Sequence, residues 1–212
     1  MDTLNSGLPL VVGVIRGMNK SPAYSFIKER IALEFQKLEK DKITPWAFLL
    51  SDKGLKLTDF YGKEINYAGV EFEGSPRNTF WKGFIQLFLQ DIVSRSFSET
   101  RSFCQTHGLD LKLPLDETAF LLKTGIKRAY HRMSEIDQRL RGRGYPDSVS
   151  RYNPEGEVAF FEAFVEERMS AELALTPKRN KTLNAFYEEQ KFWFWFIGIV
   201  VAIIGVLIKV FG

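Results

Sequence analysis

The sequence predicts an α+β cytosolic domain, a small mixed or antiparallel sheet followed by several helices, with one C-terminal transmembrane helix. Three observations lead to this fold class. Short strand-like runs fall mainly in the first third of the 212 residues, helical periodicity fills most of the rest, and the C-terminal residues are almost uniformly apolar. We therefore expect a cytosolic domain at 1–177, a basic juxtamembrane segment at 178–190 and a membrane tail at 191–212.

The first elements are predicted from short apolar runs and one amphipathic stretch. The β-branched run Leu10–Ile15 indicates a buried strand, and Trp46–Leu50 indicates a second one. Between them, Ser21 is expected to cap a helix whose first residue is Pro22. The apolar stripe of that helix consists of Tyr24, Ile27, Ile31, Phe35 and Leu38.

Two further strands are expected around the sequence YGKE. Leu55–Phe60 alternates between apolar and polar residues, as a half-exposed strand does. Along Ile65–Glu73 the apolar residues change parity, so we expect a bulge at Ala68–Gly69 that keeps them all on the core side.

Three more helices follow. The first starts at Asn78 and stops at Gly108, the second runs from just after Asp116 to the GRG sequence, and the third starts after Asn153–Pro154 and ends before Pro177. Their expected buried stripes are, in chain order, Phe80, Phe84, Leu87, Phe88 and Ile92, then Phe120, Ile126, Tyr130, Met133 and Leu140, then Phe160, Phe161, Phe164, Val165 and Met169.

The tail predicts a membrane span. No charged residue occurs from Phe192 to Ile208, and a helix that reaches Phe211 would be ~30 Å long, the thickness of a hydrocarbon core. A buried core helix is the alternative, but such helices rarely carry so long an apolar run at a chain end. The uniformly apolar surface also argues against a helix that lies on the membrane.

The residues at the ends of the tail predict its orientation. Trp193 and Trp195 suit one headgroup layer, and Lys209 can reach water at the other. Four basic residues precede the span, which places the N-terminal domain in the cytoplasm: Lys178, Arg179, Lys181 and Lys191. The chain is thus expected to be a tail-anchored, single-pass membrane protein.

Small residues within the tail indicate self-association. Gly198, Ala202 and Gly205 follow i, i+4, i+7 spacing and so share one helix face. Small residues allow two membrane helices to approach closely, which favours a homo-oligomer. The same residues also occur in membrane helices that have no partner.

A cluster of basic residues suggests contact with an anionic surface. Near a bilayer these side chains can bind headgroups, each contributing on the order of 1 kcal/mol. A solvated helix face with paired charges is the equally weighted alternative. The expected anion or headgroup contacts are Lys127, Arg128, Arg132, Arg139, Arg141 and Arg143, with His131 and Arg151 nearby.

The sequence from Gly13 to Ser21 joins a predicted strand to a helix, as phosphate-binding loops do. Its spacing departs from that motif, because Gly13 and Gly17 enclose three residues and Met18–Asn19 separate Gly17 from Lys20. An ordinary strand-to-helix turn is therefore the preferred interpretation.

Other chemistries find little support in the sequence. Cys104 lies on an apolar stretch and is expected to be an inert buried thiol, and the two histidines, His107 and His131, lack partners at metal-ligand spacing. The net charge of +3 does not indicate a nucleic-acid binder. We predict no catalytic residue, metal site or cofactor.

The leading functional hypothesis is a tethered interaction or regulatory module that self-associates and binds an unidentified protein partner. One alternative is a membrane-disrupting effector driven by oligomerisation of the tails, although so apolar a helix offers no polar lumen face. A second alternative is a membrane-localised enzyme that acts on a phosphorylated substrate near Lys20.

Overall fold

The computed structural model describes residues 20–48, 54–69, 76–142 and 150–175. The chain divides into two compact units, Met1–Ala174 and Leu175–Gly212, and the elements named below all belong to the first. In chain order they are helix α1 (Tyr24–Leu38), π-helix η1 (Glu39–Ile43), helix α2 (Thr44–Ala47), strands β1 (Leu55–Thr58) and β2 (Glu64–Tyr67), π-helix η2 (Arg77–Ile85), and helices α4 (Gln86–Thr106), α5 (Lys112–Arg141) and α6 (Glu155–Ala174).

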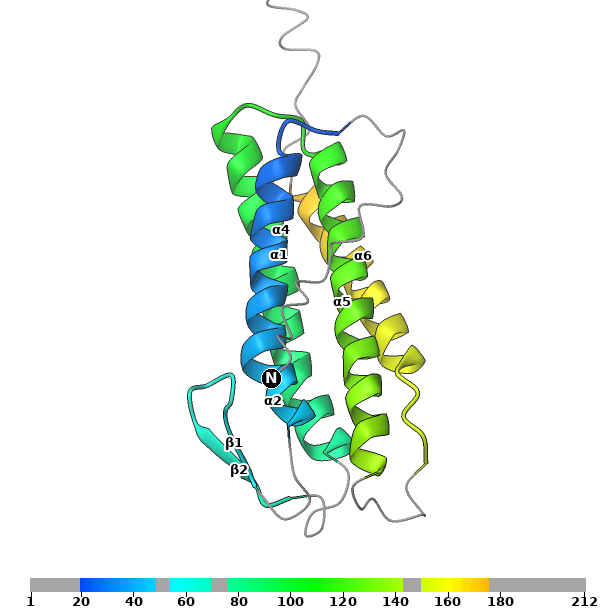
Figure 1. Cartoon of the computed structure of the whole chain (residues 1–212). Helices are drawn as coiled ribbons and strands as arrows, with labels where there is room; N and C mark the ends of the chain where they lie inside the picture. The colour runs from blue at the N-terminus through cyan, green and yellow to red at the C-terminus, as the bar shows by residue number, and fades with distance from the viewer. Residues whose placement is uncertain (1–19, 49–53, 70–75, 143–149, 176–212) are drawn as a thin grey trace, which may run out of the picture. The chain divides into compact units, whose positions relative to one another are not determined.

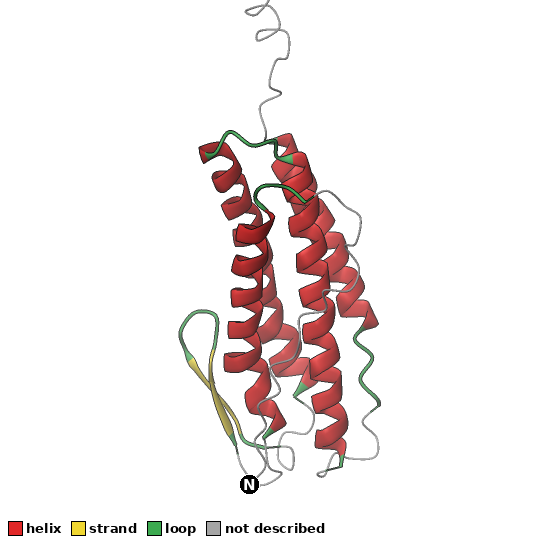
Figure 2. Cartoon of the chain, turned by 45° about the horizontal axis from the view of Figure 1, so that its top comes forward, coloured by secondary structure: helices red, strands yellow, loops and turns green. Residues whose placement is uncertain are grey.

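Four long helices form a bundle, and the two strands lie beside it (Figure 1). Helices α4 and α5 each pack against the other three long helices and are therefore the central helices of the described domain. The strands form one antiparallel hairpin in which Leu55 pairs with Tyr67 and Thr58 with Glu64 (Figure 2). The described domain is thus mostly helical with a small antiparallel sheet, the coarse α+β composition that the sequence predicts.

The core forms where the apolar stripes of the helices meet, as amphipathic helices require. Most predicted stripe residues are buried or half-buried in it, including Ile27 on α1, Ile126 on α5 and Phe161 on α6. Two predictions were wrong: Phe120 is 45 % exposed and Phe160 is 50 % exposed. Each lies on the outer side of its helix, beyond the arc that the neighbouring helices cover.

The start of α1 differs from the prediction. The helix begins at Tyr24 rather than at Pro22, and the Ser21 side chain does not cap it. Instead, the Ser21 hydroxyl donates to Glu117 Oε2, and the Ser21 amide donates to Glu117 Oε1 at 2.8 Å. Because Glu117 lies on α5, the serine connects two helices instead of satisfying one helix end.

The strand predicted at Trp46–Leu50 was wrong over the part that the structure describes. Thr44–Ala47 forms the short helix α2, with Pro45 in its first turn. The Trp46 ring packs at 5.2 Å from the Tyr67 ring and at 5.7 Å from the Phe80 ring. Burial of one large aromatic side chain explains the apolar run equally well, and it needs no neighbouring strand.

The predicted helices exist, but two of them begin differently. The helix expected at Asn78 starts at Arg77 and runs as a π-helix as far as Ile85 before it becomes α4. Helix α5 starts at Lys112 rather than after Asp116, and the Lys112 amide donates to the Asp110 carboxylate at 2.8 Å. Helix α6 begins directly after Asn153–Pro154, as predicted.

Several predictions lie outside the described residues. These are the strand at Leu10–Ile15, the part of the predicted strand beyond Gly69, and the whole tail. Within the ranges that are described, no helix combines the length and the apolar character needed to cross a bilayer.

Candidate functional site

The basic cluster lies on α5, and the structure divides it into paired and unpaired charges. Arg128 Nη2 lies 3.5 Å from Glu39 Oε2, across the junction with η1, and Arg132 Nη1 lies 2.7 Å from Glu135 Oε2. Lys127 and Arg139 are exposed and form no salt bridge with another described residue. Two of the six predicted anion contacts, Arg128 and Arg132, therefore lie close to a neutralising carboxylate.

Arg141, another predicted anion contact, lies toward the interior. Its Nε is 3.7 Å from Asp137 Oδ2, one helical turn earlier. Arg143 lies outside the described residues, as do the tail residues predicted to lie at the membrane interface or between packed helices, namely Lys191, Trp193, Trp195, Lys209, Gly198, Ala202 and Gly205. Those assignments remain predictions.

Helix α6 presents the opposite charge beside the basic face of α5. It contains six glutamates and a single arginine, and Glu162, Glu166 and Glu167 are exposed. The two helices run antiparallel, because Lys123 pairs with Glu166 while Tyr130, further along α5, lies 6.0 Å from Phe161. A basic stripe and an acidic stripe are thus neighbours on one side of the bundle.

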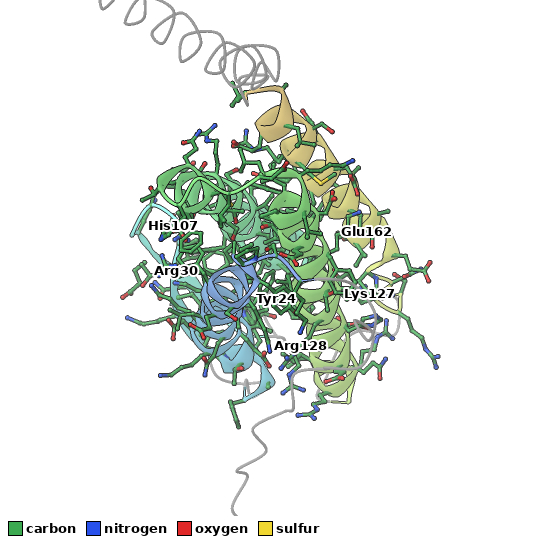
Figure 3. The ribbon with its side chains drawn as sticks, turned by 90° about the horizontal axis from the view of Figure 1, so that it is seen from above. Tyr24, Arg30, His107, Lys127, Arg128 and Glu162 are labelled. Atoms are coloured by element: carbon green, nitrogen blue, oxygen red, sulfur yellow. The ribbon has the colours of Figure 1, made fainter. Side chains whose placement is uncertain are left out.

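Lys127 and Glu162 mark the two stripes. Figure 3 shows them on adjacent helices at the same side of the bundle. They are both exposed, and no salt bridge joins them within 4 Å in this structure. Both side chains are therefore accessible to a charge on another molecule.

A buried ionic cluster lies at the end of α5. Asp137 is fully buried, and its Oδ1 is 3.2 Å from Arg77 Nε on η2. Arg77 also donates to the Ser150 carbonyl at 2.8 Å, and its guanidinium lies 5.8 Å from the Tyr152 ring centroid. The cluster connects η2 and α5 to the segment that precedes α6. The sequence does not predict the burial of Asp137, because its partner Arg77 lies far away along the chain.

Two tyrosines close to this cluster are strongly affected by burial. Desolvation, assisted by the nearby Glu157 carboxylate, raises the pKa of Tyr130 and of Tyr152 far above the usual range. The Tyr130 ring lies 6.0 Å from the Phe161 ring and the Tyr152 ring lies 5.8 Å from the Trp81 ring, so both tyrosines pack with aromatic neighbours.

A small pocket lies between the hairpin turn and η2. Its volume is about 220 Å³. Asp59 is the single ionisable acid among the residues that line it, and the other lining residues are Phe60, Tyr61, Ile65, Phe80, Gly83, Phe84 and Leu87. Nothing in the sequence predicts this pocket, because its walls come from two separate segments that each look like ordinary apolar structure.

The proposed phosphate loop gains no support from its described end. The Ser21 hydroxyl and amide both bind the Glu117 carboxylate, and Lys20 Nζ lies over the Tyr24 ring at 4.5 Å. A carboxylate at this position would repel a phosphate. Gly13 and Gly17 lie outside the described residues.

Cys104 is buried, as the sequence predicts. Desolvation raises the pKa of its thiol, and the carboxylates of Asp110 and Glu117 add to this effect. His107 stacks on Phe103 with ring centroids 4.1 Å apart. Across the described ranges, no three histidine, cysteine or acidic side chains are grouped as a metal ion requires.

Comparisons with models of known protein families, with curated proteins and with solved structures found no match to this chain.

Proposed function

We propose that the chain is a tail-anchored membrane protein whose helical domain is a self-associating interaction module. The observation that supports this most directly is the pair of opposite stripes on α5 and α6, with Lys127 and Glu162 both exposed. Such a surface is complementary to a second copy of itself. The apolar run from Phe192 to Phe211 supports the anchor.

The arrangement of the stripes selects one symmetry for the dimer. If two copies face each other across a two-fold axis parallel to the helices, α5 of one copy meets α6 of the other, and opposite charges are matched. A two-fold axis across the helices would instead place α5 on α5. The two-fold axis parallel to the helices also points both α6 C-termini in the same direction, as two tails in one membrane require.

Tethering compensates for the weakness of the individual contacts. Exposed ion pairs contribute only ~0.2–1 kcal/mol each, which is too little for a dimer in dilute solution. Confinement to a membrane raises the effective concentration of one copy for another without any new contact. Small residues in the tail, Gly198, Ala202 and Gly205, favour the same association.

The test uses full-length chains in liposomes, with donor and acceptor fluorophores on the N-termini. Lys127→Glu and Glu162→Lys should each reduce energy transfer, because each change places like charges at both contacts of the two-fold dimer. An equimolar mixture of the two variants should restore it, since both contacts of the heterodimer are again attractive. Lys37→Glu, an equal charge change on the exposed side of α1, is the matched control.

Two outcomes would contradict the dimer. The first is energy transfer that neither reversal changes. The second is a loss of energy transfer with Lys127→Glu that the mixture does not restore and that occurs only with anionic lipid. That result would assign Lys127 to headgroup contact instead.

The anchor has its own test. The intact protein should stay in the pellet when membranes are washed with alkaline carbonate, and a chain truncated before Lys191 should be released. Release of the intact protein would contradict the membrane anchor but would leave the charge-matched contact between α5 and α6 unaffected.

A further inference from the structure

The pocket between the hairpin turn and η2 has aromatic walls. Phe60 and Tyr61 come from the turn, while Phe80 and Phe84 come from η2. Phe60 and Phe84 also pack against the same neighbour, Phe88, at centroid distances of 5.4 and 5.2 Å. Phe60 is 39 % exposed and Tyr61 is 79 % exposed, so these rings still present surface to an incoming group.

One ammonium group of the chain already lies over these rings. Lys42 Nζ is 5.0 Å from the Phe88 centroid and 5.7 Å from the Phe84 centroid, and it donates to the Thr58 carbonyl at 2.7 Å. Ring faces carry a negative quadrupole that attracts cations. Lys42 is not part of the pocket lining, so the pocket itself contains no positive charge.

Asp59 gives the lining a negative charge. Its Oδ1 accepts hydrogen bonds from the Tyr61 amide at 2.9 Å and from the Lys63 amide at 2.7 Å. These bonds hold the carboxylate at the hairpin turn, which also carries the lining residues Phe60 and Tyr61. Several aromatic rings together with one fixed carboxylate form the arrangement that binds quaternary ammonium groups.

We propose that this pocket binds the trimethylammonium group of choline. An alkylated ammonium can place its methyl groups against the rings, and the carboxylate compensates its charge. The volume of about 220 Å³ is below the ~300–1,000 Å³ of sites for drug-sized ligands, so it suits one headgroup.

Gly83 keeps the pocket open on the η2 side. A Cβ atom built at this residue has no heavy atom within 4 Å, so a larger side chain there would project into free space at the pocket wall. Gly83→Leu should therefore fill the pocket while the buried face of η2 stays intact.

The experiment compares choline with its neutral isostere 3,3-dimethylbutan-1-ol. Both are titrated into the full chain in a maltoside detergent that lacks choline, and binding is followed by saturation-transfer NMR. Choline should bind about five- to thirtyfold more tightly, because a cation over several partly desolvated rings gains on the order of 1–2 kcal/mol that the neutral isostere lacks.

Three variants test separately the carboxylate charge, the aromatic ring and the free volume of the pocket. Asp59→Asn retains the Oδ1 acceptor for the turn and removes the charge, so it should lower choline affinity severalfold and leave the isostere unaffected. Phe60→Leu keeps an apolar wall without the π-face and should act in the same way. Gly83→Leu should abolish the binding of choline and of the isostere. Unchanged thermal unfolding temperatures of Asp59→Asn and Phe60→Leu would show that the fold is preserved.

Two further arms identify the source of the group. Phosphatidylcholine nanodiscs are compared with choline-free nanodiscs, and a preference for the former supports the proposal and names a lipid as the source. A trimethyllysine peptide is compared with its unmethylated counterpart, and tighter binding of the methylated peptide than of choline would overturn the assignment to choline. Equal binding of choline and its isostere, or choline binding that Asp59→Asn and Phe60→Leu both leave unchanged, would overturn it, and so would no choline binding at all.

Discussion

The Phe35 ring on α1 packs directly against Gly125 on α5. A Cβ atom at Gly125 would lie 2.5 Å from Cε2 of that ring, closer than real Cβ contacts occur. The absence of a side chain at Gly125 therefore allows α1 to approach α5 closely. The hydrogen bonds between Ser21, just before α1, and Glu117 on α5 join the same two helices.

Gly125→Ala should destabilise the domain although alanine favours helices. The propensity gain is at most ~1 kcal/mol, whereas overpacking against the Phe35 ring costs ~1–3 kcal/mol. Gly156→Ala on α6 is the control, because a Cβ atom there meets nothing within 4 Å. Chemical denaturation should show a lower midpoint for Gly125→Ala and an equal or higher one for Gly156→Ala. A higher midpoint for both would show that the ring moves aside at little cost.

Asp137→Asn should be among the most destabilising isosteric changes in the described domain. The substitution leaves the Arg77 and Arg141 guanidinium groups close together without their shared buried carboxylate. Removal of one partner from a buried ionic group costs about 3–5 kcal/mol. The matched control is Glu135→Gln on the same helix, because the Glu135 side chain is exposed and the expected change is below ~1 kcal/mol. Similar denaturation midpoints for the two variants would contradict the structural role of the cluster.

Tyr130→Phe should stabilise the domain, and more so at alkaline pH. No described residue hydrogen-bonds to the buried Tyr130 hydroxyl, so its removal should gain on the order of 1 kcal/mol at neutral pH. Burial raises the pKa of this phenol above the unfolded value of about 10, so the folded state holds its proton more tightly. The stability linked to that proton is fully present below pH ~10 and is lost as the pH rises further. The advantage of the variant should therefore grow between neutral pH and pH ~11 in denaturation curves, and a constant difference would contradict this linkage.

Cys104 should react slowly with iodoacetamide in the folded protein. Burial hides the thiol, and its raised pKa lowers the thiolate fraction that performs the attack. Mass spectrometry should show little alkylation over a period that modifies glutathione completely, and full alkylation in guanidinium chloride. Comparable rates in both conditions would show that α4 opens readily around this residue.

Part of the fold follows from local sequence. Gly108 ends α4 with a φ of +64°, a conformation that glycine adopts without strain, and Asn153 Oδ1 accepts from the Glu155 amide at 3.0 Å at the start of α6. These features depend on residues within a few positions of each other, so the sequence alone predicts them.

Predictions failed where distant segments decide the outcome. Trp46 belongs to a short helix because Tyr67 and Phe80 receive its ring, and nothing in residues 46–50 indicates those partners. Ser21 carries all the features of a helix cap, yet Glu117, far along the chain, binds its hydroxyl. Local propensity differs between alternatives by about 1 kcal/mol, which one tertiary contact can outweigh.

The same division holds for function. Hydropathy and charge are properties of each segment alone, so the sequence predicts an apolar tail after a domain that contains an amphipathic, basic helix. Three features are visible only in the folded domain. Glu39 faces Arg128, and the acidic helix α6 lies beside Lys127. The hairpin turn and η2 enclose an aromatic pocket with Asp59. Charge pairing and cavities depend on which side chains face each other across helices, and packing of the whole chain sets that arrangement.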